Sequence, residues 1–229
     1  MSRLSSGPVA DSHWFASDFI LAASLVIIQP SSAKVVIVND THDQTWFLPR
    51  GRKDVGESLE QCALREGFEE SGYQAEFLPI YTQSIAPVGP AAPPGARHMP
   101  NTEAIFVTTT YAKPRQTERG LRTGQEYMAF YYVGQIPPDA VRQTGTGMPD
   151  EQSYVGTLVD IEEALRRLSD PTDAWVTHTA FWLWQHTLEE QEKMRKEEKR
   201  KRELEEQIRT QALVGPSSKP NRHSFFRFS

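Results

Sequence analysis

The sequence predicts an α+β domain with a mixed β-sheet and helices on its faces, followed by a long charged helix. Apolar runs rich in Val, Ile and Leu, which are typical of buried strands, recur along residues 18–160. A capped helical pattern at residues 58–71 lies among these runs, and charged side chains fill residues 189–209 almost completely. Strands and helices do not alternate strictly and no internal repeat is present, so the pattern favours a mixed sheet.

The strands are predicted from short runs of β-branched and aromatic residues bounded by turn signals. The first two, on either side of the turn PSSA, are expected to pair as a hairpin or meander, and Pro49 ends the third. The Pro-, Gly- and Ala-rich stretch 86–101 is predicted to be a loop, and a loop of this length is usually functional or disordered. The predicted strands are residues 18–29, 34–40, 45–49, 74–85, 103–112 and 126–136, with a shorter one at the start of residues 153–168.

Two helices are predicted after the last strand. The first ends near residue 168, and the second begins after SDPTD with large side chains at spacings of three and four. This spacing predicts a packing face formed by Trp175, His178, Phe181, Trp182, Gln185 and Leu188. Further along, Glu and Lys or Arg lie three and four positions apart, and each such pair stabilises an exposed helix by about 0.2–0.5 kcal/mol. The charged half is therefore expected to leave the body of the domain, and we classify it as coiled coil.

The chain is divided on this basis into a flexible segment (1–17), one domain (18–188), a charged helical extension (189–211) and a disordered tail (212–229). Residues 1–188 carry 14 Lys and Arg against 22 Asp and Glu, whereas residues 189–229 carry 11 against 8. The acidic body argues against non-specific nucleic-acid binding. The acidic body does not exclude an anionic substrate if a metal ion bridges the repulsion.

Several further features of the sequence bear on the cellular compartment and on binding partners. No apolar run is long enough to span a bilayer, and the start MSRLSSGPVADSHW lacks the apolar core of a signal peptide. Cys62 is the single cysteine, so a reducing compartment is the simpler interpretation. We predict a cytoplasmic location, with a nuclear one as the alternative because KRKR (199–202) resembles an import signal. The same helix could contact a protein partner, although such charge runs are usually solvated faces.

The helix at residues 58–71 carries carboxylates where apolar side chains are expected. Ser58 and Gln61 form the sequence pattern of a capping box, and Gly72 can end the helix in the left-handed conformation. At 100° per residue, one face of this helix begins apolar and becomes acidic towards its end. The side chains within about 60° of the direction of Leu59 are Cys62, Ala63, Glu66 and Glu70.

This acidic face needs compensation, because carboxylates one turn apart repel each other and lose hydration when they are buried. Glu69 adds to the repulsion between Glu66 and Glu70. Arg65 can reach Glu69 or Glu57, but a single guanidinium cannot offset three or four carboxylates. Carboxylate oxygens are the ligands that Mg²⁺ and Mn²⁺ prefer, so the face predicts a divalent-metal site.

The spacing of these residues resembles the Nudix box of the Nudix hydrolase family. The fixed residue types are present in order as Gly51, Glu57, Arg65, Glu66, Glu69, Glu70, Gly72 and Tyr73. The departure is Gly67, where the family usually has an aliphatic residue, and glycine inside a helix costs about 1 kcal/mol relative to alanine. With the lead-in WFLP and the late LVDIEEAL, the resemblance spans residues 18–190 and implies a Nudix fold, an α/β/α sandwich.

The resemblance also implies an enzyme, a pyrophosphohydrolase, and assigns roles by position. Glu66 matches a ligand or the general base, and Glu57 with Arg65 matches the pair that orients the loop and the helix. In parts of the family the base lies in a loop outside the box, where Asp150 and Glu151 are the candidates. The positions that match ligands for Mg²⁺ or Mn²⁺ are Gly51, Glu66, Glu69 and Glu70.

Cations near the box are the predicted substrate contacts. Arg50, Arg52 and Lys53 lie at its start, and Arg97 lies in the loop 86–101, which could close over a substrate. Three cations suit a phosphorylated small molecule with more than two phosphates, so a dinucleoside polyphosphate or an inositol pyrophosphate is favoured. The alternatives are ADP-ribose, an mRNA cap as the one form of nucleic acid, or an inert Nudix fold that serves as a binding scaffold.

Overall fold

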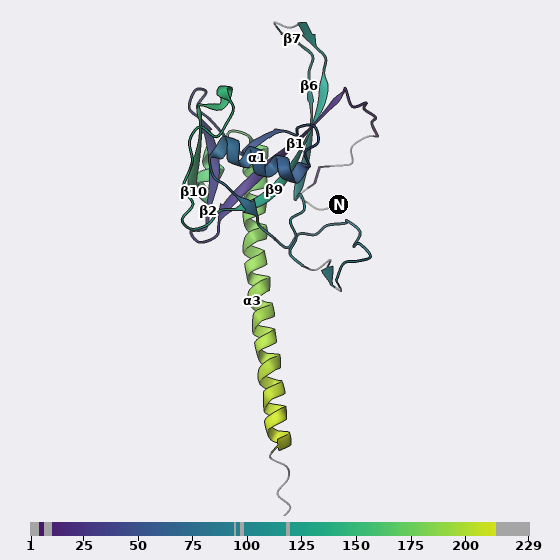
Figure 1. Cartoon of the computed structure of the whole chain (residues 1–229), viewed down its shortest axis with the longest axis vertical. Helices are drawn as coiled ribbons and strands as arrows, with labels where there is room; N and C mark the ends of the chain where they lie inside the picture. The colour runs from purple at the N-terminus through teal and green to yellow at the C-terminus, as the bar shows by residue number, and fades with distance from the viewer. Residues whose placement is uncertain (1–4, 7–10, 94, 97–98, 118–119, 214–229) are drawn as a thin grey trace, which may run out of the picture. The chain divides into compact units, whose positions relative to one another are not determined.

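The computed structural model describes residues 5–6, 11–93, 95–96, 99–117 and 120–213. The chain divides into two compact units, Met1–Thr187 and Leu188–Ser229. The described part of the first unit contains a mixed sheet of eight strands, in which β10, β2, β1 and β9 are neighbours in that order (Figure 1). Its strands are β1 (Phe19–Gln29), β2 (Lys34–Asp40), β3 (Thr45–Phe47), β4 (Arg50–Arg52), β5 (Glu76–Phe77), β6 (Phe106–Ala112), β9 (Gln125–Gln135) and β10 (Tyr154–Asp160).

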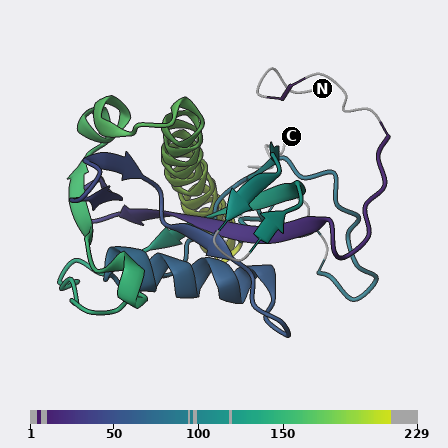
Figure 2. The ribbon, with the colours of Figure 1, turned by 90° about the horizontal axis from the view of Figure 1, so that it is seen from above.

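Helices cover both faces of this sheet. One core lies under α1 (Leu59–Ser71) and includes Cys62 and Ala63 of that helix. The other core lies under α2 (Ile161–Arg167) and the first part of α3 (Pro171–Leu213). Figure 2 shows α1 on one side of the strands and these helices on the other. The predicted α+β class and α/β/α sandwich are confirmed. Among the described helices, none combines the length and the apolar character that crossing a membrane requires.

The long strands agree with the prediction, and the short ones differ from it. β1 and β2 form the expected antiparallel hairpin, and β9 pairs with β1 in parallel. The predicted strand 45–49 ends at Phe47, and after Pro49 the chain forms β4, which pairs with β1. The predicted strand 74–85 is reduced to β5, because β6 pairs with β9 over residues 125–131 and leaves β5 only the far end of that strand. A separate hairpin, β7 (Arg115–Thr117) with β8 (Gly120–Arg122), was not predicted.

The predicted packing face of α3 is wrong except at Phe181, which is buried. Trp175, His178 and Trp182 are exposed, whereas Val176 and Trp184 are buried against the sheet. Large aromatic side chains lie all around this helix, so their spacing does not single out one face. The face that packs combines two aromatic side chains, Phe181 and Trp184, with smaller residues such as Ala180. The buried residues of α3 are Asp173, Val176, Thr177, Ala180, Phe181, Trp184 and Thr187.

Gly67 is explained by the packing of α1 on the sheet. A Cβ at this position would lie 2.8 Å from Cδ2 of Leu25, a fully buried residue of β1. We predict that Gly67→Val destabilises the protein by about 1–3 kcal/mol through overpacking, despite removing a helical glycine. Urea denaturation of Gly67→Val, Leu25→Ala and the double variant measures this effect. The double variant should be more stable than the sum of the single losses implies, and simple additivity would contradict the contact.

Candidate functional site

Helix α1 begins and ends where the sequence predicts. Ser58 Oγ accepts a hydrogen bond from Gln61 N at 3.2 Å, and Gln61 Oε1 accepts one from Ser58 N at 2.8 Å, which completes the capping box. Gly72 follows the helix with φ 75° and donates its N–H to the carbonyl oxygen of Phe68. The two caps fix the register of the carboxylates between them.

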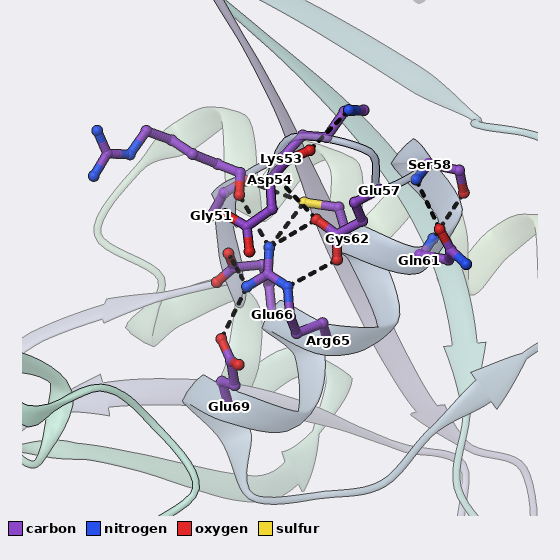
Figure 3. A network of polar contacts seen from close by, with 11 residues as sticks. Gly51, Lys53, Asp54, Glu57, Ser58, Gln61, Cys62, Arg65, Glu66 and Glu69 are labelled. Carbon is purple, nitrogen blue, oxygen red and sulfur yellow. Dashed lines mark hydrogen bonds and ion pairs between the residues drawn. The ribbon is translucent and has the colours of Figure 1, made fainter.

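Arg65 is the centre of the polar network in Figure 3. Its Nε and Nη2 donate to the two oxygens of Glu57 at 2.8 and 2.9 Å, and its Nη1 donates to Glu66 Oε1 at 2.7 Å and to Glu69 Oε2 at 2.9 Å. Nη2 also donates to the carbonyl oxygen of Arg52 at 3.0 Å. The hydrogen bonds from Arg65 lower the pKa of Glu57 to about 2. The prediction that Arg65 reaches Glu69 or Glu57 was too narrow, because it binds both of them and Glu66.

Glu66 lies beside the backbone of Gly51 and is only 6% exposed. A Cβ at Gly51 would overlap the carboxyl group of Glu66, so only glycine allows β4 to come this close to α1. Cys62 Sγ donates to the Gly51 carbonyl oxygen at 3.6 Å, and burial raises the pKa of this thiol to about 12. Burial also raises the pKa of Glu66, against the opposing effect of Arg65.

Glu70 is buried to the same extent, but the described ion pairs of Arg65 do not include it. Among the described residues its hydrogen bond comes from the main-chain N–H of Arg50, which donates to Oε2 at 2.7 Å. Burial, together with the charges of Glu66 and Glu151, raises the pKa of Glu70 to about 8, against the lowering effects of this bond and of the Arg50 charge. Glu70 is therefore the carboxyl group of the cluster whose ionisation is least compensated.

The loop between β9 and β10 closes over the end of α1. Thr146 Oγ1 donates to the main-chain carbonyl oxygen of Glu69 at 2.8 Å, and the loop ends in the 3₁₀ helix η2 (Pro149–Glu151). Glu151 is half-buried, and its charge is one of those that raise the pKa of Glu70. Asp150, the other predicted alternative base, is exposed. Of the two, Glu151 is therefore the one that lies near the acidic cluster.

The predicted substrate cations lie in different settings. The guanidinium of Arg50 donates through Nη1 to Asp173 Oδ1 at 3.1 Å, so its side chain forms an ion pair within the protein on the α3 face of the sheet. Arg52 is exposed, and Lys53 is half-exposed with its Nζ on a neighbouring carbonyl oxygen at 2.9 Å. Arg97 lies outside the described residues. Arg52 and Lys53 are thus the predicted cations that the structure brings to the loop beside the acidic cluster.

Asp173 was not predicted to lie near the site. It is fully buried, and its Oδ2 accepts a hydrogen bond from Leu48 N at 3.2 Å. The direction of its partner Arg50 could have been predicted from the strand period, because successive side chains point to opposite faces and Gly51 faces α1. The prediction ended the strand at Pro49, so the period was not applied to Arg50 and Gly51. An aspartate in the first turn of a helix gives no comparable signal, since that position is common for exposed acids.

A divalent ion fits the chemistry of this cluster. Among the described residues, no group of three or more His, Cys, Asp or Glu side chains is arranged to hold a metal ion as it stands. The donors are nevertheless carboxylate oxygens beside a glycine carbonyl, which are hard ligands suited to Mg²⁺ or Mn²⁺. Glu70 in addition is buried without an ion pair from Arg65, and a cation would favour its ionised form.

Comparison with known proteins shows which family the sequence around the acidic cluster matches. A family model described as the NUDIX domain matches residues 18–202. The Bacillus subtilis (strain 168) protein named "Putative 8-oxo-dGTP diphosphatase" is 42% identical over 52 residues, which are 23% of this chain and 35% of that protein. The Caenorhabditis elegans protein named "Putative nudix hydrolase 1" is 24% identical over 71 residues, 30% of this chain and 20% of that one. The matches therefore span about a third and a fifth of the two relatives.

Solved structures are similar over a larger share of the chain. A NUDIX hydrolase from Nitrosomonas europaea has a TM-score of 0.41 and 18% identity, and the match covers 73% of this chain and 89% of that one. At such identities and TM-scores, these structures add nothing to the match with the family model.

Proposed function

Since this chain belongs to the NUDIX domain family, which matches residues 18–202, we propose that it is a divalent-metal-dependent hydrolase that cleaves a pyrophosphate bond. The observation that carries the proposal is the convergence of Glu66 and Glu70, both 6% exposed, with the backbone of Gly51 at one end of α1. Buried carboxylates with raised pKa values beside a guanidinium network are typical of catalytic sites rather than of structural helices.

Each residue of the cluster has a role in this proposal. Glu66, Glu69, Glu70 and the Gly51 carbonyl would hold Mg²⁺ or Mn²⁺. Such an ion, when bound, neutralises pyrophosphate oxygens and lowers the pKa of a water molecule. Arg65 holds Glu57 through two hydrogen bonds and so keeps the loop 52–57 against α1. Arg65 also holds one oxygen each of Glu66 and Glu69, which leaves the second oxygen of each carboxylate as a potential ligand.

A carboxylate must take the proton of the attacking water. Glu66 suits this role because its raised pKa makes it a stronger base than an exposed glutamate. Glu151 suits it because it approaches the cluster from a separate loop and would remain free if Glu66 were a ligand. If Glu66 binds the ion, Glu151 can therefore act as a separate base.

We predict that Glu151→Gln lowers the rate of hydrolysis by about 10²–10⁴-fold, the usual contribution of a general base. Glutamine keeps an oxygen for the hydrogen bond that Glu151 Oε2 accepts from Met148 N at 2.8 Å, so the loop should stay in place. Asp150→Asn is the matched control and should leave the rate unchanged, because Asp150 is exposed. Steady-state kinetics at saturating Mn²⁺ measures both. Equal rates in Glu151→Gln and wild type would place the base in the box, at Glu66.

The substrate class is proposed from charge. Arg52 is exposed and Lys53 is half-exposed beside an otherwise acidic cluster, which suits a chain of more than two phosphates. We therefore favour a dinucleoside polyphosphate or an inositol pyrophosphate, with ADP-ribose and capped RNA as the alternatives. The name of the Bacillus subtilis relative adds 8-oxo-dGTP as a further compound to test.

A substrate panel tests the proposed function. Diadenosine tetraphosphate, an inositol pyrophosphate, ADP-ribose, capped RNA and 8-oxo-dGTP are each incubated with the full chain and Mg²⁺ or Mn²⁺, and products are separated by anion exchange. Hydrolysis that requires the ion and is lost in Glu69→Gln supports the proposal. Turnover of every compound at the buffer rate would contradict it.

A catalytically inert scaffold is the second candidate. It is favoured by the observation that Arg65 already pairs with three carboxylates of the cluster, those of Glu57, Glu66 and Glu69. In that case the charged part of α3 would contact a protein partner, and no compound of the panel would be hydrolysed faster than in buffer. Mn²⁺ binding separates the two candidates, because a scaffold of this kind has no need of the ion.

A further inference from the structure

Helix α3 supplies a residue, Asp173, that is linked to the acidic cluster through Arg50, from the opposite face of the sheet. Asp173 lies in its first turn and is fully buried. Its Oδ1 accepts from Arg50 Nη1 at 3.1 Å and its Oδ2 accepts from Leu48 N at 3.2 Å, so one carboxylate holds the chain on both sides of Pro49. Tyr131 fixes the same guanidinium, since its Oη accepts from Arg50 Nη1 at 2.6 Å.

The segment held in this way carries a contact to the cluster. Arg50 directs its side chain towards α3, while its main-chain N–H donates to Glu70 Oε2 at 2.7 Å on the α1 side. The next residue, Gly51, abuts the carboxyl group of Glu66. A displacement of Arg50 would therefore move the donor that holds Glu70 and the backbone that borders Glu66.

Stability alone is a weak reason for a charged pair at this place. A buried ion pair is often no more stabilising than apolar residues of similar volume, because both charges lose their hydration. Leu48, which donates its N–H to Asp173, and Val176, one turn further along α3, are apolar and fully or almost fully buried. Unlike apolar residues, Asp173 can orient the chain, because its carboxylate accepts hydrogen bonds from two specified donors.

We propose that Asp173 is a positioning residue of the acidic site: it anchors Arg50, whose main-chain N–H orients the carboxylate of Glu70 for metal binding. This inference rests on the proposed function, because it takes Glu70 to be a ligand. Partners that orient a metal ligand typically change metal affinity by about 10–100-fold when they are lost. Asp173 should behave as such a partner although it lies on the far side of the sheet.

The test is Mn²⁺ binding to the full chain, measured by electron paramagnetic resonance of free Mn²⁺. Asp173→Asn keeps the shape of the side chain but loses the charge and one of the two acceptor oxygens, and we expect its Kd for Mn²⁺ to rise at least about tenfold. The rate on whichever panel compound is hydrolysed should fall at limiting Mn²⁺ and return towards the wild-type value at high Mn²⁺. A defect that high Mn²⁺ does not reverse would contradict positioning.

Thr187→Val is the matched control. Thr187 is also buried on α3, and its Oγ1 accepts a main-chain hydrogen bond from Tyr81 N at 2.8 Å, away from the cluster. This variant should lose stability and keep its Kd for Mn²⁺. An equal loss of affinity in both variants, or an unchanged Kd in Asp173→Asn, would overturn the inference.

A double variant separates the effect of anchoring the segment 48–50 from the effect of an unpaired buried charge. It also keeps the inference testable if Asp173→Asn does not fold. Arg50→Met with Asp173→Leu removes both charges and should fold, as circular dichroism would show, while its Mn²⁺ affinity stays low because the segment 48–50 is no longer anchored. Wild-type affinity in the double variant would overturn the inference. If wild type itself binds no Mn²⁺ and hydrolyses nothing, the proposed function fails and this inference fails with it.

Discussion

Glu70→Gln is expected to lower metal-dependent hydrolysis by at least about a hundredfold, because loss of a ligand should exceed the effect of losing a residue that only orients one. In the absence of metal the same change should remove a pH dependence of stability. Burial raises the pKa of Glu70 to about 8 in the folded protein, from an ordinary value of 4.5. The folded state therefore binds more protons than the unfolded state between these two pH values.

The sign of the pH effect follows from this difference. Between about pH 4.5 and pH 8 the folded state keeps a proton on Glu70 that the unfolded state has released. The free energy of unfolding therefore falls as pH rises through this range. Complete ionisation of Glu70 lowers the free energy of unfolding by up to about 5 kcal/mol. Thermal unfolding in EDTA at pH 5.5 and pH 8.5 measures it, and the wild-type Tm should be clearly lower at the higher pH. Glu70→Gln should show a much smaller difference.

Glu162→Gln is the control for both readouts, because Glu162 is exposed on α2. It should keep the wild-type rate and the wild-type pH dependence. A Tm of the wild type that does not change between the two pH values would mean that Glu70 is compensated in a way that its contacts do not account for. Added Mn²⁺ should raise the wild-type Tm most at pH 8.5, since the ion stabilises the ionised form.

The part of the site that could be predicted is the part that local rules control. Ser58, Gln61 and Gly72 fix the helix ends through contacts within a few residues, so the facing of Glu66 and Glu70 followed from the helical period alone. The need for compensation followed from the charges. The identity of the compensating groups did not, because Arg65 has several carboxylates within reach and the sequence does not rank them.

The part that could not be predicted depends on contacts between distant segments. Asp173 and Arg50 are brought together only when α3 packs on the face of the sheet opposite α1. The face of α3 that packs was predicted wrongly from its tryptophans, since Trp182 is exposed and Ala180 is buried. Close packing of a helix on a sheet favours small residues at the contact, and hydrophobic spacing does not reveal which small residues these are.

Arg65→Met should be the most destabilising substitution in the box. It leaves Glu57, Glu66 and Glu69 without their shared cation, and removing one partner of a partly buried ion pair costs about 3–5 kcal/mol. In EDTA at pH 7.5 this corresponds to a fall in Tm of roughly 10 °C for a domain of this size. Arg195→Met is the control, because Arg195 pairs with Glu192 on an exposed helix surface, where solvent screens the pair, and its Tm should stay close to that of wild type.

The pH dependence of Arg65→Met identifies the mechanism of the loss. In wild type the lowered pKa of Glu57, about 2, stabilises the folded state above the ordinary value of 4.5, and this contribution is lost as pH falls through about 2. Without Arg65 the contribution is absent, so the difference in Tm between variant and wild type should be large at pH 7.5 and shrink towards pH 3. A difference that stays constant across this range would mean that Arg65 acts through the packing of its side chain. Arg65→Lys then distinguishes charge from geometry, because lysine keeps the cation but lacks the fork that binds both oxygens of Glu57.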